Sequence, residues 1–326
     1  MTVGTRLAGV VLLALVACGG GSLDAGADVH KVLPIDGRNP VLLCNDGAYD
    51  NWQGEYAALM ASSGILSLAG IIINTSPVWT GLSDNMAGWR QMVVAARQSG
   101  FRNIPDPIGS TGAMLVRPSD GKIDSTVPNR SEGATLIVKE SKSLSHPYRP
   151  LVVVTGARLT DVADAYLMDP TVADRIVVLA WLGTTTKDGS EMGRPNGEMD
   201  TWADVIVAQR LNYIQISLPY DQMTDVSTTL LSQLPVNAFT TWMRSKQPQI
   251  VNNPQAADHV AIAAVGIPSL VATVSKVAQQ GTDSNNLPTL STDDSGRVLL
   301  VSQITGALVA ARFWEMLFAP GTFTAH

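Results

Sequence analysis

Oxygen-bearing side chains gather directly after the first apolar run of the chain, Val41–Cys44. They are Asn45, Asp46, Asp50 and Asn51. The short apolar run predicts a buried strand, and the segment behind it, Gly54–Ser63, predicts a helix. Open α/β sheets bind ligands at the carboxyl ends of their strands, and carboxylate and amide oxygens suit a hard cation such as Ca²⁺ or Mg²⁺. The same residues are also typical of an Asx-rich turn that only caps the following helix, so the stretch alone leaves both interpretations open.

Strand-like and helix-like segments alternate along the rest of the chain. The predicted strands are Val41–Cys44, Leu68–Ile73, Leu151–Val154, Ile176–Leu182, Tyr213–Ser217, Ser269–Val274 and Arg297–Val301. The predicted helices are Gly54–Ser63, Met86–Ser99, Glu132–Lys142, Leu159–Met168, Trp202–Arg210, Asn237–Ser245, Ala257–Val265 and Gly306–Phe318. Several strands are apolar on both faces, as parallel strands covered by helices must be. The pattern predicts an α/β fold with a doubly wound, mostly parallel, Rossmann-like sheet in a single domain, residues 40–326.

The composition is that of a folded, acidic protein. The chain has 326 residues, of which 45% are hydrophobic and 15% charged, and its formal net charge is -6. These values indicate a sizeable core rather than a disordered chain. The negative charge argues against a nucleic-acid partner, although a mononucleoside is compatible with it.

The first residues have the pattern of an export signal. Arg6 precedes an apolar run, Leu7–Ala17, which is too short to span a bilayer and ends in small residues before Cys18. The segment resembles the lipobox of bacterial lipoproteins, which implies cleavage of residues 1–17 and lipidation of Cys18. Residues 18–39 then form a flexible tether, and the protein is expected at a membrane face outside the cytoplasm, at the outer membrane if the cell has one. The alternative is an ordinary signal peptide with an incidental cysteine.

The second cysteine has no partner in the sequence. If Cys18 carries a lipid, Cys44 cannot form an intramolecular disulfide, because the chain has only 2 cysteines. We expect Cys44 to be buried at the end of the first strand as a small hydrophobic residue.

Four motifs follow one another along the chain. They are Cys44–Asn51 (C-N-D-G-A-Y-D-N), Val154–Ala163 (V-T-G-A-R-L-T-D-V-A), Asn196–Asp200 (N-G-E-M-D) and Ala257–Ala261 (A-D-H-V-A). In their order they resemble the inosine-uridine preferring nucleoside hydrolase family, whose corresponding segments are D-x-D-P-G-x-D-D, P-T-G-P-L-T-N-[IV]-A, E-F-N and H-D-x-x-A. The resemblance runs from about residue 41 to residue 265 and implies the doubly wound fold of that family.

The resemblance also implies a reaction and a set of residues. Family members hydrolyse the N-ribosidic bond of a nucleoside with the help of Ca²⁺. Asp46 matches the Asp that ligates calcium and takes the proton of the attacking water. The implied metal ligands are Asp46, Asn51, Thr155 (through its backbone carbonyl) and Asp258, and the implied substrate-binding residues are Asp50, Asn196, Glu198 and Asp200. The implied partner is a small nucleoside or glycoside, and a homo-oligomer is possible because family members are often dimers or tetramers.

Two departures from the family pattern bear on catalysis. Asn51 replaces a bidentate Asp, which removes one negative charge and should weaken the binding of Ca²⁺. Ala257 replaces a His near the leaving base. His259 lies only two residues further on, about 200° around a helix, so we interpret it as a packing or surface residue.

Three functions are therefore weighed. The first is a membrane-tethered, Ca²⁺-dependent nucleoside hydrolase in which Asp46 activates a metal-bound water. The second is a non-catalytic lipoprotein that binds a nucleoside or sugar in a degraded hydrolase site, and the third is a structural or adhesion role. The order of the motif residues along the chain favours the hydrolase, and ribose release with and without a chelator separates it from the others.

Overall fold

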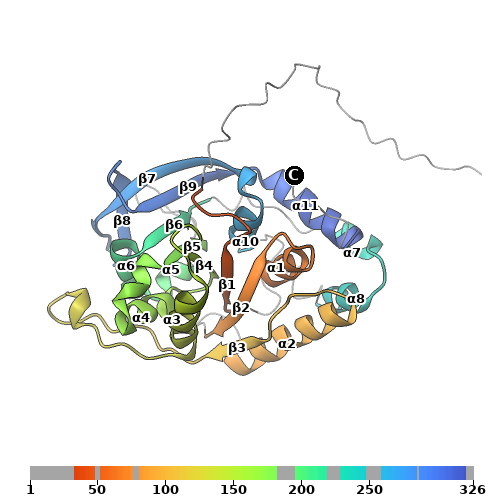
Figure 1. Ribbon diagram of the computed structural model, residues 1–326, viewed down its shortest axis with the longest axis horizontal. Coiled ribbons are helices and arrows are strands. Elements are labelled where there is room, and N and C mark those ends of the chain that lie inside the picture. Colours follow the sequence, from red (N-terminus) through yellow and green to blue (C-terminus); the bar gives the residue numbers. More distant parts are fainter. Residues whose placement is uncertain are drawn as a thin grey trace, which may run out of the picture. The chain divides into compact units, whose positions relative to one another are not determined.

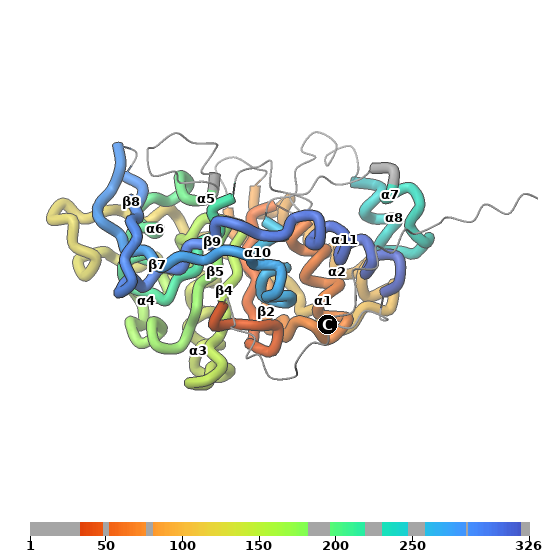
Figure 2. Tube along the Cα trace, turned by 90° about the horizontal axis from the view of Figure 1, so that it is seen from above, coloured from red at the N-terminus to blue at the C-terminus, as the bar shows by residue number. Residues whose placement is uncertain are grey.

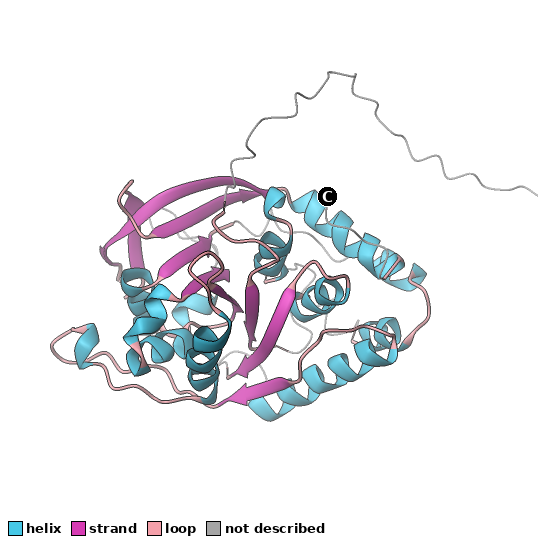
Figure 3. Cartoon of the chain, in the orientation of Figure 1, coloured by secondary structure: helices cyan, strands magenta, loops and turns pink. Residues whose placement is uncertain are grey.

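A nine-stranded sheet runs through the part of the chain that the computed structural model describes, namely residues 33–47, 52–75, 81–181, 195–218, 228–246, 258–284 and 286–320. Its strands are β1 (Pro40–Asn45), β2 (Ser67–Asn74), β3 (Pro107–Ser110), β4 (Leu151–Gly156), β5 (Ile176–Trp181), β6 (Asn212–Ile216), β7 (Val271–Thr282), β8 (Pro288–Thr292) and β9 (Val298–Ile304). They lie in the order β3-β2-β1-β4-β5-β6-β9-β7-β8. Figure 3 shows the strands in magenta. The strands from β3 across to β9 are parallel, whereas β7 runs antiparallel to both of its neighbours, β9 and β8.

Helices cover both faces of the sheet (Figure 1). The helices are α1 (Gln53–Ser62), α2 (Leu82–Gln98), α3 (Glu132–Leu144), α4 (Thr160–Met168), α5 (Pro195–Glu198), α6 (Thr201–Arg210), α7 (Thr228–Gln233), α8 (Ala238–Ser245), α10 (His259–Gly266) and α11 (Gly306–Phe318). One hydrophobic core contains side chains of α3, α4 and α6, and the other contains side chains of α1, α2, α8, α10 and α11. The arrangement confirms the predicted doubly wound, mostly parallel α/β fold.

The strand sequences account for this layered packing. In β1, Val41 and Leu43 belong to one core, and Leu42 and Cys44 belong to the other. Successive side chains of a strand point to opposite faces, so a strand buried on both sides needs a continuous apolar run. The runs in β4 and β5 are divided between the two cores in the same alternating way.

The chain is packed into this core before β1 begins. Leu33 and Ile35 are buried, and Asn39 donates a side-chain hydrogen bond from Nδ2 to the carbonyl oxygen of Pro150 at 2.9 Å. The folded part therefore includes residues ahead of the predicted boundary at residue 40. The division into signal peptide, tether and domain stays a prediction.

The C-terminal part of the sheet differs in detail from the expectation. The strand predicted at Ser269–Val274 is β7, which continues to Thr282, and the short strands β3 and β8 were not predicted. β7, β8 and β9 form the flank of the sheet beside α6, with the end of β9 leading to α11 (Figure 2). No helix in the described ranges has the length and apolar character needed to cross a membrane.

Candidate active site at the carboxyl ends of β1 and β4

The order of the strands reverses at β1, and this reversal lies beside the predicted site. β2 and β3 lie on one side of β1, and β4, β5 and β6 lie on the other. Cys44 is paired with Thr155 and Asn45 with Gly156, so the two parallel strands end at the same level. Such a switch point is where doubly wound sheets bind ligands. Asp46, the predicted catalytic residue, follows β1 directly at this point.

The turn that carries Asp46 is held by two side chains of α2. Asn85 Nδ2 donates to the backbone carbonyl of Asp46, and Trp89 Nε1 donates to that of Gly47 at 2.9 Å. Asn45 Oδ1 accepts from the backbone N–H of Gly47 at 2.8 Å, which is an Asx turn. Asp46 is only 1% exposed. The turn is therefore fixed in a dry environment, where a carboxylate interacts strongly with charged or polar partners.

The described residues of this stretch do not cap the helix that follows. Trp52 occupies the N-cap position of α1 with φ of 58°, and no side chain makes a capping hydrogen bond there. Asp50 and Asn51, which were predicted to bind the sugar and the metal, lie outside the described residues. Among the described residues, the helix-cap interpretation of the stretch has no support.

Asp258, the last of the predicted metal ligands along the sequence, is connected to the end of β1 through side-chain amides. Asn45 Nδ2 donates to Gln53 Oε1 at 2.8 Å, and Gln53 Nε2 donates to the backbone carbonyl of Asp258 at 3.2 Å. All three residues are buried. These bonds bring the N-terminal end of α10 to the carboxyl end of β1.

The carboxylate of Asp258 lies against the end of β4. A Cβ atom added to Gly156 would lie 2.5 Å from Cγ and 2.7 Å from Oδ2 of Asp258. Asn196, a predicted substrate-binding residue, approaches from α5: its Nδ2 lies 3.5 Å from Asp258 Oδ1 and donates to the carbonyl of Trp181 at 2.8 Å. The glycine thus allows the acidic side chain to lie close against the backbone of Gly156. The structure therefore brings four predicted residues, Asp46, Thr155, Asn196 and Asp258, to the same end of neighbouring strands.

The donor types at this end of the sheet fit a hard cation. Asp46 and Asp258 offer carboxylate oxygens, and Thr155 offers a backbone carbonyl. The hydroxyl of Thr155 is used locally, because it donates to the carbonyl of Ala157 at 2.9 Å and accepts from its N–H at 3.1 Å. Within the described ranges, no three His, Cys, Asp or Glu side chains are close enough together to hold a metal ion. A complete metal site would therefore need backbone oxygens or further ligands such as the predicted Asn51.

Glu198 and Asp200, predicted to contact the sugar, lie beside a different hollow. Both line a pocket of about 280 Å³ together with Arg117 and Trp202. The side chain of Glu198 is exposed.

The carboxylate of Asp200 makes three hydrogen bonds within the protein. Its Oδ1 accepts from the N–H of Ala203 at 3.1 Å and caps α6, and its Oδ2 accepts from Thr160 Oγ1 at 2.6 Å and from the N–H of Leu115 at 3.0 Å. Burial raises the pKa of Asp200, while these hydrogen bonds oppose the rise. Asp200 therefore joins α4, α6 and the loop after β3, and its contact with a sugar stays a prediction.

A buried polar cluster beside the site was not predicted. Asp161 Oδ1 accepts from Ser110 Oγ at 2.7 Å and from Ser131 Oγ at 2.8 Å, and Asn74 Nδ2 lies 3.4 Å from Oδ2. Burial raises the pKa of Asp161, while these hydrogen bonds and the charge of Arg158 oppose the rise. Asn74, Ser110 and Asp161 follow or end β2, β3 and β4, so the cluster joins the carboxyl ends of three strands.

Arg158 is the second unpredicted residue of this region. It is buried, and its Nη2 donates to Thr75 Oγ1 and to the carbonyl of Gly112. A charged residue directly after a buried strand, within the second motif, is the sequence feature that could have drawn attention to it.

Cys44 and His259 are packing residues. Burial, with a smaller contribution from the charge of Asp161, raises the pKa of the Cys44 thiol well above its ordinary value. Burial lowers the pKa of His259 to about 3, and its ring lies edge-on to that of Tyr56 at 6.0 Å. Both side chains are in the uncharged form at neutral pH, as expected of core residues.

The comparisons with known proteins give a fold. No family model matches the sequence, and no curated protein matches it. Among solved structures, the chain is similar to an inosine-guanosine nucleoside hydrolase, with 14% identity over 85% of this chain and 98% of that one and a TM-score of 0.64. It is also similar to a purine-preferring ribonucleoside hydrolase from Gardnerella vaginalis (16% identity, 87% and 100% covered, TM-score 0.62) and to an inosine-uridine preferring nucleoside hydrolase from Bacillus anthracis (16%, 86% and 97%, TM-score 0.59).

The fold and the position of the site thus define a doubly wound α/β protein with a candidate site at its topological switch point. More particularly, the chain has the nucleoside hydrolase fold. The resemblance drawn from the four motifs is confirmed at the level of the fold.

Proposed function

We propose that the protein hydrolyses the N-glycosidic bond of a ribonucleoside or of a related glycoside. The observation that carries this proposal is the position of two buried acidic residues, Asp46 and Asp258, at the switch point of a sheet with the nucleoside hydrolase fold, where Asn45 and Gln53 connect β1 to the backbone of Asp258. Hydrolysis of a glycosidic bond needs a group that removes a proton from water at the reacting carbon. The hydrogen bonds that hold the turn after β1 support the choice of Asp46 as this group.

In the proposed reaction, Asp46 accepts a proton from a water molecule as that water attacks C1′ of the ribose. The bond between C1′ and the base nitrogen breaks, and the base leaves with its electron pair and takes a proton from solvent. Asp258 and the backbone carbonyl of Thr155, with Asp46, are the residues that would hold Ca²⁺. When bound, the cation would supply a lower pKa for the attacking water and an anchor for the sugar hydroxyls. Asp50 and Asn196 complete the proposal as partners of the sugar, whereas Glu198 and Asp200 have this role only through the resemblance, because they line a different pocket.

Release of free ribose from a panel of purine and pyrimidine nucleosides tests this function. We expect turnover by the wild-type protein and at least a hundredfold lower kcat for Asp46→Asn, because general-base catalysis contributes about that factor. Asp294→Asn, which removes an exposed carboxylate of the loop between β8 and β9, is the matched control and should be as active as the wild type. If no nucleoside of the panel is cleaved, or if Asp46→Asn is as active as the wild type, the proposal fails.

The metal is tested separately from turnover. We expect Ca²⁺ to raise the Tm of the chelator-treated wild-type protein, because a ligand that binds only the native state stabilises it. Asp258→Asn should abolish this shift and, with it, the activity. An equal shift in both proteins would place calcium elsewhere.

We also propose that the protein is anchored through a lipid on Cys18 at a membrane face outside the cytoplasm. The basis is the lipobox-like segment that ends at Cys18. Cys18→Ser should move the protein from the membrane fraction to the soluble fraction, and retention of the variant in the membrane would contradict the anchor.

A further inference from the structure

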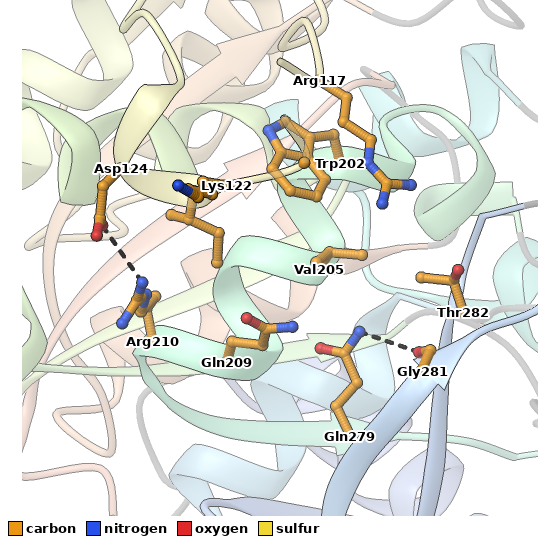
Figure 4. Close-up of a pocket in the computed structure, with 12 residues that line it drawn as sticks. Arg117, Lys122, Asp124, Trp202, Val205, Gln209, Arg210, Gln279, Gly281 and Thr282 are labelled. Carbon is orange, nitrogen blue, oxygen red and sulfur yellow. Dashed lines mark hydrogen bonds and ion pairs between the residues drawn. The ribbon is translucent and has the colours of Figure 1, made fainter. Parts of the chain in front are cut away.

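A second pocket is lined by none of Asp46, Thr155, Asn196 and Asp258, although it shares Arg117 and Trp202 with the pocket beside Glu198 and Asp200. Its volume is about 390 Å³, within the range of small-molecule sites. α6 provides one wall, the segment from Arg117 to Asp124 another, and the end of β7 a third (Figure 4). Trp202, Val205 and Gln209 follow one another along α6 in this view.

The lining is cationic, although the chain as a whole carries a net charge of -6. It contains Arg117, Lys122 and Arg210 and a single carboxylate, that of Asp124. This carboxylate is engaged, because Arg210 Nη2 lies 3.3 Å from Asp124 Oδ1. In the described part of the chain, neither Arg117 nor Lys122 forms an ion pair. Two positive charges thus remain for an anionic ligand.

One of these cations is held in place by an aromatic ring. The guanidinium of Arg117 lies 5.1 Å from the centroid of the Trp202 ring, a cation–π contact. The ring is itself buried and fixed, since Trp202 Nε1 donates to Thr126 Oγ1 at 3.0 Å. Arg117 is therefore positioned in advance, which lowers the entropic cost of binding a ligand.

Two further polar atoms of the lining are buried and have no hydrogen-bond partner among the described residues. They are Arg210 Nε, which is a donor, and Gln279 Oε1, which is an acceptor. The amide of Gln279 is oriented by its other end, because Nε2 donates to the carbonyl of Gly281 at 3.0 Å (Figure 4). Its oxygen can therefore receive a hydroxyl hydrogen, and Arg210 Nε can donate to an oxygen.

We propose that this pocket binds an anionic monosaccharide, that is, a sugar phosphate or a sugar acid. The anionic group is bound by Arg117 and Lys122, and the sugar supplies the hydroxyl donor for Gln279 Oε1 and an oxygen acceptor for Arg210 Nε. The apolar face of the sugar ring packs on Val205 and on the edge of Trp202. A bare anion has no ring to pack on Val205 and Trp202, and a neutral sugar lacks the charge that the cations need.

Calorimetry on the full-length Asp46→Asn protein tests the proposal, because this variant removes turnover as a complication. The probes are ribose 5-phosphate, glucuronate, ribose and inorganic phosphate. We expect saturable binding of at least one of the two anionic sugars, at least tenfold tighter than that of ribose or phosphate. Tighter binding of ribose 5-phosphate would show that the pocket selects a sugar phosphate, and tighter binding of glucuronate that it selects a sugar acid.

Substitutions place the binding in this pocket. Lys122→Gln and Arg117→Gln should each weaken it by about tenfold, as expected for loss of one charge-assisted hydrogen bond. Lys139→Gln removes a positive charge from an exposed side chain of α3 and should leave the affinity unchanged. Gln279→Leu should weaken the binding of the sugar but not that of inorganic phosphate.

Three results would overturn the proposal. The first is the absence of saturable binding by both anionic sugars, and the second is equal affinity in the wild-type pocket and in Lys122→Gln and Arg117→Gln. The third is loss of binding in Asp258→Asn with retention in Lys122→Gln, which would place the sugar at the candidate active site. All three measurements are independent of nucleoside turnover, so failure of the hydrolase proposal leaves this one standing.

Discussion

At the scale of single residues, Gly156 decides where the Asp258 carboxylate can lie. Gly156→Ala would place a methyl group 2.5 Å from Cγ of Asp258, so that the acidic side chain must move away from the end of β4. We expect at least tenfold weaker Ca²⁺ binding and a similar loss of any hydrolase activity, together with a lower Tm without calcium, since overpacking at a buried position costs about 1–3 kcal/mol. The shift of Tm with calcium and the rate of ribose release measure the two effects. Gly281→Ala, where the nearest atom would be 3.6 Å away, is the control.

Cys44 gives a second prediction at this scale. Its thiol is buried and its pKa is raised, so the thiolate that reacts with disulfide reagents is scarce in the folded protein. In a Cys18→Ser background, Ellman's reagent should detect no thiol in the native protein and one per chain in denaturant. Rapid reaction of the native protein would contradict the burial of Cys44.

The residue types of the sequence predicted part of the candidate site. Asp46, Thr155 and Asp258 follow or precede apolar segments, so their meeting at the strand ends could be anticipated from the fold. Asp200 shows the limit, because a carboxylate that caps a helix and one that binds a sugar have the same sequence signature. Only the hydrogen bond from the N–H of Ala203 reveals the cap, and the bonds from Thr160 and Leu115 show that the second oxygen is engaged as well.

At the scale of secondary-structure elements, the Asp161 cluster ties together β2, β3, the start of α3 and α4. Asp161→Ala would leave Ser110, Ser131 and Asn74 with fewer partners in a buried place. We expect a loss of about 3 kcal/mol in the free energy of unfolding, since each buried polar group left unsatisfied costs about 1–3 kcal/mol. Denaturant titration measures it. The exposed Asp174→Ala should change stability by less than about 0.5 kcal/mol, and an equal effect of the two substitutions would mean that the cluster is unimportant.

The strands also differ in how well their sequences predict them. The central parallel strands were predicted because burial on both faces demands a continuous apolar run. β3 and β8 have the sequences Pro107-Ile-Gly-Ser110 and Pro288-Thr-Leu-Ser-Thr292, each with a single large aliphatic residue, and lie at the two edges of the sheet. Such strands form because a neighbouring strand offers hydrogen bonds, which the local sequence does not show.

At the scale of the whole molecule, buried His259 makes stability depend on pH. The unfolded chain binds a proton at His259 below about pH 6.5, whereas the folded protein does so only near pH 3, so stability falls as the pH falls through this window. The loss is about 1.4 kcal/mol per pH unit well below 6.5. His259→Phe keeps a ring beside Tyr56 without a titrating group. Relative to the wild type, it should gain stability as the pH is lowered from 7 to 4.5, as urea unfolding in the presence of a chelator would show. Parallel pH profiles for the two proteins would contradict a buried neutral histidine.

The place of β9 in the sheet has a consequence for how the protein is made. β9 is the last strand in the described part of the chain, yet it lies between β6 and β7 and pairs Val298 with Tyr213 and with Val277. Until a ribosome has released residues 298–304, β6 keeps an open edge and the β7–β8 hairpin has no strand to join. Contacts that are so distant in sequence form slowly. The sheet therefore cannot close before β9 has been made, and this delay would favour the translocation of a chain that we propose is exported.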